Sequence, residues 1–184
     1  MANKNSRKVR SLVLASLFVA LDFLFTRIFC INLMGGAERI SLQFLASAVC
    51  GWVMGPWWGA AAAGVADLVG ALIGTSGLTF FPGFTLTAAL RGLCYGLLLH
   101  RKKVSFPRCL LATGVSGIVL GLLLNSFWLT FYMGKNFLAY VTAKAPFQLI
   151  LFPLQAVVLY LVLRSLKKHD FDKKAMALPP EPRK

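Results

Sequence analysis

Charged residues are scarce in this sequence, and acidic ones are the scarcest. Only 14% of the 184 residues are charged and only six are Asp or Glu, whereas 58% are hydrophobic and the mean hydropathy is +0.71. Soluble domains carry about 25% charged residues, so this composition excludes an ordinary soluble domain. A stretch of about 20 apolar residues can span a bilayer, and the chain holds several. The composition therefore predicts one all-α integral membrane domain.

Catalytic and nucleotide-binding motifs are also missing. The sequence contains no GxxxxGK[ST] phosphate-binding loop, no HExxH and no GxSxG. ATP hydrolysis, zinc-dependent proteolysis and serine hydrolysis use these motifs in their common forms. The two histidines and four cysteines match no metal-ligand spacing, and no CxxC pair occurs. We therefore expect a protein that is not an enzyme, has no ATPase site of its own and needs no metal or cofactor.

The charge that is abundant is positive, and the net charge is +14. Fifteen of the twenty Lys and Arg residues lie in three segments, residues 4–10, 101–108 and 164–184. None of these segments is long enough to fold as a nucleic-acid-binding module, whereas cytoplasmic loops of membrane proteins collect basic residues. The apolar run from Val9 to Phe29 lacks a small-residue cleavage site and is too long for a signal peptide, so we expect a retained first span.

Six apolar stretches predict six membrane spans. Their approximate ranges are 9–29, 40–54, 57–74, 84–99, 109–132 and 142–163. Six spans put all three basic segments on one side, which the excess of Lys and Arg predicts to be cytoplasmic. We expect the membrane domain to cover residues 1–166 and the charged, proline-rich residues 167–184 to form a disordered cytoplasmic tail.

Each predicted span carries one polar side chain at a similar depth. At 1.5 Å per residue, these side chains lie roughly 5–10 Å below the expected outer ends of the spans. They are Asp22, Gln43, Asp67, Arg91, Asn125 and Gln148. A charge such as Arg91 within hydrocarbon costs about 3 kcal/mol on insertion scales, so such groups face a partner or a watery cavity. Two interpretations stay open, a buried Asp67–Arg91 ion pair that fixes helix register or a pocket that opens to the outside.

The expected outer surface suits a ligand with a flat ring and an anionic end. The segment 74–84 carries no charge, and its Phe80, Phe81 and Phe84 offer aromatic faces for stacking. Ordinary packing of these rings against lipid is the alternative. Four basic residues are predicted near the outer face, where they suit carboxylates or phosphates. These are Arg27, Arg39, Lys135 and Lys144.

Small residues at four-residue spacing predict close approach between helices. Ser16 and Ala20 form such a pair in the first span, in the half that lies away from the polar side chains. We expect this pair to be available for docking another membrane protein.

The sequence resembles a known family of membrane proteins. The stretch FPGFTLTAALRGLCYGLLL (81–99), preceded by GPWWGAAAAGVADLVGALIG (55–74), is similar to the folate-specific S component of energy-coupling factor (ECF) vitamin transporters. An S component is the substrate-binding subunit. The resemblance covers nearly the whole chain, and its most specific part is the FPGFTL…RG…YG run together with the upstream Asp67. It implies a bundle of six membrane helices.

The resemblance also implies a function and partners. An S component captures its vitamin with high affinity at the outer face of the bacterial cell membrane. It docks on a transmembrane coupling protein and two ABC ATPase subunits, topples in the membrane and delivers the vitamin inside. Ser16 and Ala20 match the Ala-x-x-x-Ala motif through which the family docks, with a small Ser in place of the first Ala.

Residue roles follow from the same resemblance. Asp67 is expected to accept hydrogen bonds from the pterin 2-amino and ring N–H groups, and Arg91 to meet the carbonyl edge or orient Asp67. Phe81 and Phe84 are expected to stack on the ring. The full set of expected binding residues, which includes the carboxylate partners Arg27 or Lys144, is Asp67, Arg91, Phe81, Phe84, Arg27, Lys144, Asn125 and Gln148.

Other functions remain open from the sequence. An S component for another vitamin, such as riboflavin, pantothenate or a queuosine precursor, keeps the architecture and changes the ligand. A lipid-acting membrane enzyme lacks a recognisable catalytic constellation here. A purely structural assembly protein does not account for the ring of polar side chains.

Overall fold

The structure is a computed structural model, and it describes residues 4–27, 30–33, 38–73, 81–134 and 136–168. Phe80 and Lys135 lie outside the described residues, and so does the part of the expected tail after Lys168. Arg27 and Arg39 belong to described elements, but their side chains lie outside the description.

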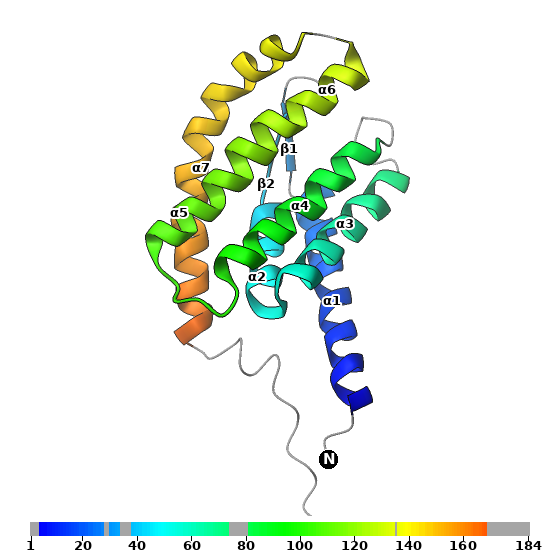
Figure 1. Cartoon of the computed structure of the whole chain (residues 1–184), viewed down its shortest axis with the longest axis vertical. Helices are drawn as coiled ribbons and strands as arrows, with labels where there is room; N and C mark the ends of the chain where they lie inside the picture. The colour runs from blue at the N-terminus through cyan, green and yellow to red at the C-terminus, as the bar shows by residue number, and fades with distance from the viewer. Residues whose placement is uncertain (1–3, 28–29, 34–37, 74–80, 135, 169–184) are drawn as a thin grey trace, which may run out of the picture.

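Six helices and one β-hairpin make up the described part of the chain (Figure 1). The elements in chain order are α1 (Lys4–Arg27), β1 (Cys30–Leu33), β2 (Glu38–Ser41), α2 (Gln43–Met54), α3 (Pro56–Leu72), α4 (Pro82–Leu99), α5 (Phe106–Gly114), the π-helix η2 (Val115–Leu124), α6 (Asn125–Met133) and α7 (Phe137–Lys168). The segments α5, η2 and α6 form one continuous fifth helix. The predicted count of six helices is therefore confirmed.

Proline marks the start of three of these helices. The rings of Pro56, Pro82 and Pro107 occupy the first turns of α3, α4 and α5, where a missing N–H costs no hydrogen bond. Gly55 precedes Pro56 with a φ of 97°, a conformation that a side chain disfavours. The pair Gly55-Pro56 thus produces the sharp reversal between α2 and α3 that the sequence predicts.

The β-hairpin is an element that the sequence analysis did not predict. Strands β1 and β2 pair antiparallel, with Ile31 opposite Ile40. The second span was expected to begin at about Ile40, and this boundary was wrong because Ile40 lies in a strand and the helix begins at Gln43. Both isoleucines are β-branched and favour strands, but four-residue strands are too short to give a clear periodic signal.

Helix α7 is longer than predicted at both ends. It begins at Phe137 rather than near residue 142, and Lys167 and Lys168 of the expected tail are still helical. Its 32 residues correspond to a length of about 48 Å, which exceeds the roughly 30 Å of hydrocarbon in a bilayer. Pro146 and Pro153 lie inside it, as membrane helices tolerate.

Three helices are long and apolar enough to cross a membrane, among the described residues. They are α4, the continuous helix Phe106–Met133 and α7. Ser11–Thr26 and α2 are apolar but shorter, and the 12 residues of α2 correspond to only about 18 Å. The remaining three spans of the six-span topology stay predictions.

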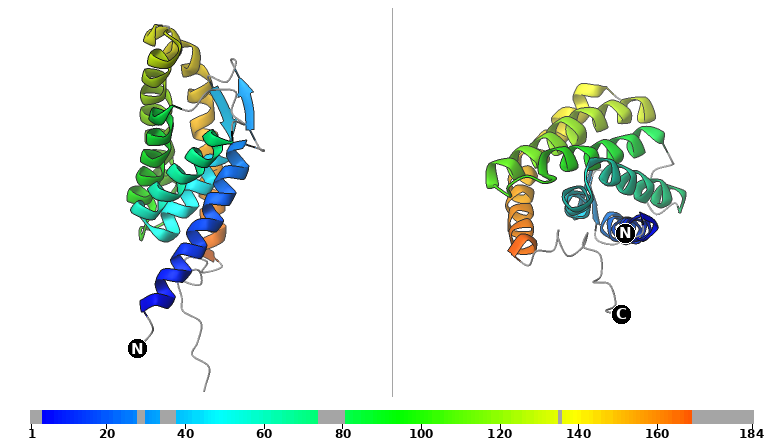
Figure 2. Two further views of the ribbon diagram at one scale, coloured as in Figure 1. Left: turned by 90° about the vertical axis from the view of Figure 1, so that its right-hand side faces the viewer. Right: turned by 60° about the horizontal axis from the view of Figure 1, so that its bottom comes forward.

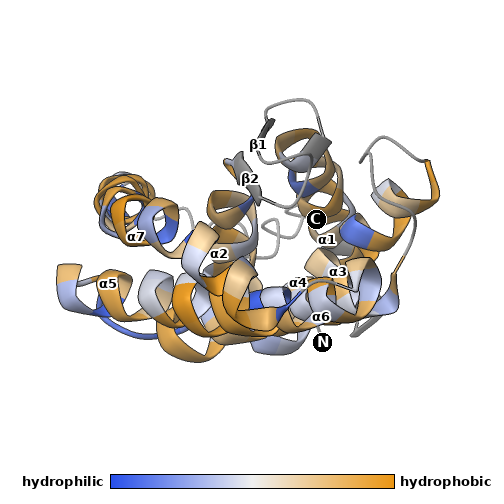
Figure 3. Ribbon diagram, turned by 90° about the horizontal axis from the view of Figure 1, so that it is seen from above, coloured by the Kyte–Doolittle hydropathy of each residue, from blue (hydrophilic) through white to orange (hydrophobic). Residues whose placement is uncertain are grey.

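Consecutive helices run in opposite directions along the long axis of the molecule (Figures 1 and 2). The β-hairpin and the α6–α7 connection lie at one end, which we call the upper half. The start of α1, the α4–α5 connection and the end of α7 lie at the other end, the lower half. Seen from above, most of the helical ribbon is apolar and hydrophilic residues are few (Figure 3).

The lower half is filled by an apolar core. Helices α1, α2, α4, α5 and α7 all contribute buried side chains to it. Its members include Phe18, Trp52, Leu99, Cys109 and Leu163. Glycines bring α3 and α4 into backbone contact beside this core, since a Cβ at Gly92 would overlap the backbone of Gly59.

Candidate ligand-binding site

The inner face of α7 changes character between the two halves of the bundle. Tyr140, Lys144 and Gln148 are buried at four-residue spacing in the upper half, whereas Ala156, Leu159 and Leu163 are buried below. Residues four apart share a helix face, so α7 presents polar groups to the upper interior and apolar groups to the lower. Burial of polar groups is costly unless they are hydrogen-bonded. The upper interior is therefore the candidate ligand-binding region.

Asp22 on α1 is the most deeply buried acid of the described residues. Its side chain is 2% exposed, and the Ser47 hydroxyl of α2 donates a hydrogen bond of 3.0 Å to its Oδ2. Its backbone carbonyl accepts a bond of 2.6 Å from Thr26. Oδ1 is buried and has no hydrogen-bond partner among the described residues. Asp22 thus ties α1 to α2 and leaves one acceptor unused.

Arg91 on α4 meets groups from three other helices. Its Nη1 donates to the Gln43 side-chain oxygen of α2 at 3.5 Å, while its Nε is buried without a partner in the described part of the chain. Gly121 of η2 lies beside the guanidinium, since a Cβ there would be in ordinary contact, 3.6 Å from Nη2 and 3.9 Å from the Gln148 amide nitrogen. Asp22 is close enough to be attracted by Arg91. We call Asp22, Gln43, Ser47, Arg91 and Gln148 the inner polar cluster.

Asp67 on α3 has a different environment. It is half-buried, and the Thr85 hydroxyl of α4 donates a bond of 2.9 Å to its Oδ2. No ion pair joins Asp67 to Arg91, although both side chains are described. The interpretation of a direct Asp67–Arg91 pair therefore does not match the observed contacts.

Four aromatic rings gather above the inner polar cluster. The ring centroid of Phe81 lies 5.6 Å from that of Phe84, 5.8 Å from Trp128 and 6.0 Å from Tyr132. We call these four rings the aromatic group. The Trp128 indole donates a bond of 3.1 Å to the Thr87 hydroxyl, which fixes α6 against α4. Phe84 precedes Arg91 by seven residues, about 10 Å along α4, so a flat ring has stacking partners above and polar partners below.

The remaining expected binding residues lie on α6 and α7. Lys144 is 1% exposed and lies one turn from Gln148 on α7. The Gln148 amide packs against Gly117, where a Cβ would overlap it. Asn125 is half-buried at the start of α6. Arg91 and Gln148 therefore come together around Gly121, and Phe81 and Phe84 come together with each other.

The predicted set of binding residues lacks several side chains that lie at this site in the structure. Asp22 and Gln43 stood in the predicted ring of polar side chains but received no binding role, although an ionisable residue within a span is itself a functional signal. Trp128 and Tyr132 looked like ordinary apolar residues of the fifth span. Ser47 carried no signal, because serine is common in membrane helices.

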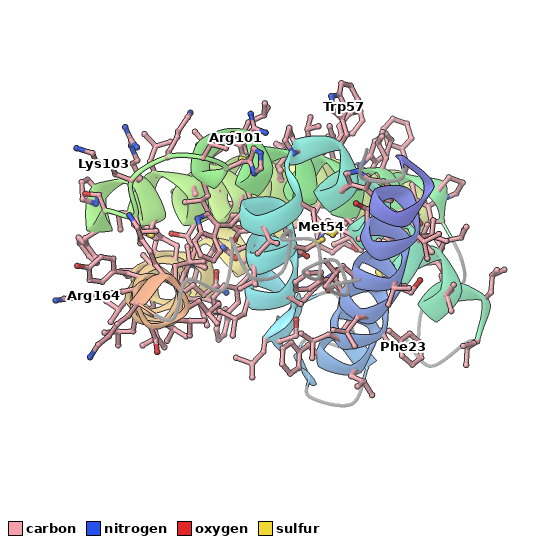
Figure 4. The ribbon with its side chains drawn as sticks, turned by 90° about the horizontal axis from the view of Figure 1, so that it is seen from below. Phe23, Met54, Trp57, Arg101, Lys103 and Arg164 are labelled. Atoms are coloured by element: carbon pink, nitrogen blue, oxygen red, sulfur yellow. The ribbon has the colours of Figure 1, made fainter. Side chains whose placement is uncertain are left out.

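A separate groove lies on the outside of α1 and α3. Its volume is about 560 Å³, and small and apolar side chains line it. Both residues of the predicted docking pair, Ser16 and Ala20, belong to its lining. The Ser16 hydroxyl donates to the Leu12 carbonyl at 2.9 Å, so this serine adds no unsatisfied polar group to the groove. Phe23, labelled in Figure 4, is another lining residue.

A family model described as "ECF transporter, substrate-specific component" matches residues 10–163. The chain belongs to this family. This S component is 30% identical over 154 residues to the folate transporter FolT of Clostridium novyi (strain NT). The aligned region covers 84% of the chain and 88% of that relative. It is also 30% identical over 162 residues to FolT of Leuconostoc mesenteroides subsp. mesenteroides, with 85% of each chain covered.

Solved structures agree with the family assignment. The crystal structure of FolT bound with folic acid superposes with a TM-score of 0.75 at 30% identity, covering 83% of this S component and 92% of that chain. The S-component for biotin from an ECF-type ABC transporter gives a TM-score of 0.64 at 19% identity, which shows a shared fold. The expected S-component fold is confirmed, and the chain belongs to a family of substrate-specific transporter components.

Proposed function

We propose that this S component binds folate or a reduced folate in the upper half of the bundle and serves as the capture subunit of an ECF-type importer. Two relatives at 30% identity are folate transporters, and one solved relative is bound with folic acid. The observation that carries the proposal within the chain is the inner polar cluster beneath the aromatic group. This arrangement suits a flat heterocycle whose edge carries both donors and acceptors.

The proposed binding residues divide by chemistry. Phe81 and Phe84 stack on the pterin, and Arg91 donates to its carbonyl edge. Asp67 borders the pocket on the α3 side. Gln148 and Asn125 offer amide groups from α7 and α6. A cation, either Lys144 or Arg27, meets the glutamate carboxylates of the ligand.

We propose that both termini face the cytoplasm. The lower end of the bundle carries exposed basic side chains from the α4–α5 connection and the end of α7, of which Arg101, Lys103 and Arg164 are labelled in Figure 4. Basic residues next to membrane spans concentrate on the cytoplasmic side. The upper half, with the candidate site, then opens to the outside of a bacterial cell membrane.

We further propose that the groove between α1 and α3 receives a helix of the transmembrane coupling protein. Ser16 and Ala20 are small, exposed and set four residues apart, which permits close approach of a second helix. Two ABC ATPase subunits bound to that coupling protein supply the energy for transport.

Ligand-dependent stability tests the proposed substrate. Thermal unfolding of the purified chain is measured with folic acid, riboflavin or pantothenate. A ligand that binds only the folded protein stabilises it by about 4 kcal/mol at a thousandfold excess over Kd, so folic acid is expected to raise Tm clearly. A rise in Tm with riboflavin or pantothenate and none with folic acid or a reduced folate contradicts the proposal.

A further inference from the structure

We infer that Asp22 is the carboxylate that receives the ring N–H donors of the ligand, and that it makes the site specific for a ring bearing an amino group next to a ring N–H. The inference rests on the proposed binding of folate and deepens it. The resemblance to the folate-specific S component implied this role for Asp67. The contacts of the two carboxylates point to Asp22 instead.

The unused oxygen of Asp22 is the first observation. The side chain is 2% exposed, so water reaches it poorly. Ser47 satisfies Oδ2, but the buried Oδ1 has no hydrogen-bond partner among the described residues. A buried carboxylate oxygen without a donor is costly, and a ligand N–H that reaches it removes that cost. Asp22 is therefore prepared for a donor that the described chain does not supply.

Asp67 lacks this property. Its Oδ2 already accepts a hydrogen bond from Thr85, and the side chain is half-buried rather than enclosed. Neither of its oxygens belongs to the buried polar atoms without a partner in the described residues. A ligand therefore gains less from meeting Asp67, because that carboxylate is hydrated or bonded before the ligand arrives.

Arg91 supplies the complementary observation. Its Nε is also buried without a partner in the described part of the chain, and the hydrogen bond from Nη1 to Gln43 is at the outer limit of such bonds, at 3.5 Å. The Asp22 acceptor and the Arg91 donor attract each other without forming an ion pair within the described contacts. A ring edge that carries N–H donors beside a carbonyl acceptor matches both. The pterin of folate has this edge, with a 2-amino group and N3–H next to the C4 carbonyl.

A purely structural role for Asp22 makes a different prediction. Through Ser47 the carboxylate joins α1 to α2, so its loss could weaken binding by loosening the bundle. Such loosening would weaken the binding of all ligands of similar shape to the same degree. Loss of a specific contact with the ring donors would weaken the binding of only those ligands that carry them.

The experiment is calorimetric titration of the purified full chain with two ligands, folic acid and an analogue that lacks the 2-amino group and is methylated at N3, so that neither donor remains. The wild-type chain is compared with Asp22→Asn, with Asp67→Asn as the competing assignment, and with the control Thr113→Val, a buried position on α5 whose hydroxyl bonds only within its own helix. We expect wild type to bind folic acid at least tenfold more tightly than the analogue. Asp22→Asn is expected to lower the affinity for folic acid by about ten- to a hundredfold, the range for a charged hydrogen bond. Its affinity for the analogue, and both affinities of Thr113→Val, should change by less than about threefold. Asp67→Asn should lower the two affinities, if at all, to the same degree.

Each other outcome has a defined meaning. Equal loss for both ligands in Asp22→Asn, or unchanged binding of folic acid by the folded variant, overturns the inference and leaves the proposed function intact. The same holds if Asp67→Asn shows the ligand-dependent loss. If wild type binds no folic acid at all, the proposed function fails and the inference falls with it.

A second variant covers the case in which Asp22→Asn does not fold. Ser47→Ala removes the donor that orients Asp22 while keeping the carboxylate. We expect it to lower the affinity for folic acid by about three- to tenfold, the range for one neutral-donor hydrogen bond, without changing the affinity for the analogue. Equal losses for the two ligands overturn the inference.

Discussion

Several polar side chains in the upper half are buried in surroundings that would be unfavourable for an isolated polar group. Arg91 lies in the middle of α4, on a helix long and apolar enough to cross a membrane. Its guanidinium makes a weak contact with Gln43 and lies beside Gly121, and its Nε is buried and unbonded among the described residues. A ligand oxygen at this point would satisfy a group that is otherwise expensive to bury.

Arg91→Ala is expected to lower the affinity for folic acid at least tenfold. Losing one hydrogen bond to a charged group costs about 1.5–3 kcal/mol. Calorimetric titration measures the change, and thermal unfolding without ligand checks that the variant is folded. Wild-type affinity in a folded Arg91→Ala protein would remove this residue from the site.

The sequence predicted the depth of the polar side chains better than their pairing. Helical rise fixes how far each residue lies along its span, so Asp22, Gln43 and Arg91 could be placed in one layer. The direction in which a side chain points around its helix depends on which neighbours the helix packs against. For this reason Asp22 was left without a binding role, and Asp67 was placed beside Arg91 although its hydrogen-bond partner is Thr85.

At the scale of helices, close packing of α3 and α4 depends on glycine. The backbones approach so closely at Gly59 and Gly92 that neither position has room for a Cβ. The atoms in the way belong to the backbone of the facing helix, which cannot rotate aside as a side chain can. The two helices that carry Asp67 and Arg91 are thereby held at a fixed spacing.

Gly92→Ala is therefore expected to destabilise the protein by about 1–3 kcal/mol, the usual cost of overpacking. Gly114→Ala is the matched control, because a Cβ there meets nothing within 4 Å. Alanine is a better helix former than glycine, so the control should keep or raise Tm. Comparable Tm values for the two variants would show that the α3–α4 contact yields easily.

Element boundaries show what a one-dimensional pattern can and cannot provide. The helix starts at Pro56 and Pro82 were close to prediction because proline acts locally. The β-hairpin and the π-helical turns of η2 were not anticipated. Both depend on how neighbouring helices are joined and packed, and a run such as VSGIVLGLLL reads equally well as an ordinary α-helix.

At the scale of the whole molecule, the proposed functions occupy different surfaces. The inner polar cluster lies inside the upper half, the groove of α1 and α3 lies on the outside, and the basic residues gather at the lower end (Figures 1 and 4). Ligand binding and partner docking should therefore be separable by mutation.

Ala20→Trp is expected to abolish assembly with the coupling protein and to leave the affinity for folic acid within about threefold of wild type. A large ring at this exposed position fills the groove in which a second helix would pack. Leu154→Trp, at an exposed position on α7 away from the groove, is the control. A pull-down with the coupling protein measures assembly. Capture of Ala20→Trp at the wild-type level would exclude the groove as the docking site.

Topology can be measured on the intact chain. We expect green fluorescent protein fused after Lys184 to be fluorescent in bacterial cells, and alkaline phosphatase fused at the same position to be inactive. Both results follow if the basic lower end is cytoplasmic. An active phosphatase fusion would reverse the proposed orientation.

The apolar core of the lower half has a consequence for the path of the cargo. Phe18, Trp52, Leu159 and Leu163 are packed tightly across the bundle below the polar layer. The proposed ligand, folate, carries two carboxylates and would have to lose their hydration to move straight down through this apolar core. Release on the far side is less costly if the protein turns as a rigid body and carries the inner polar cluster toward the opposite leaflet.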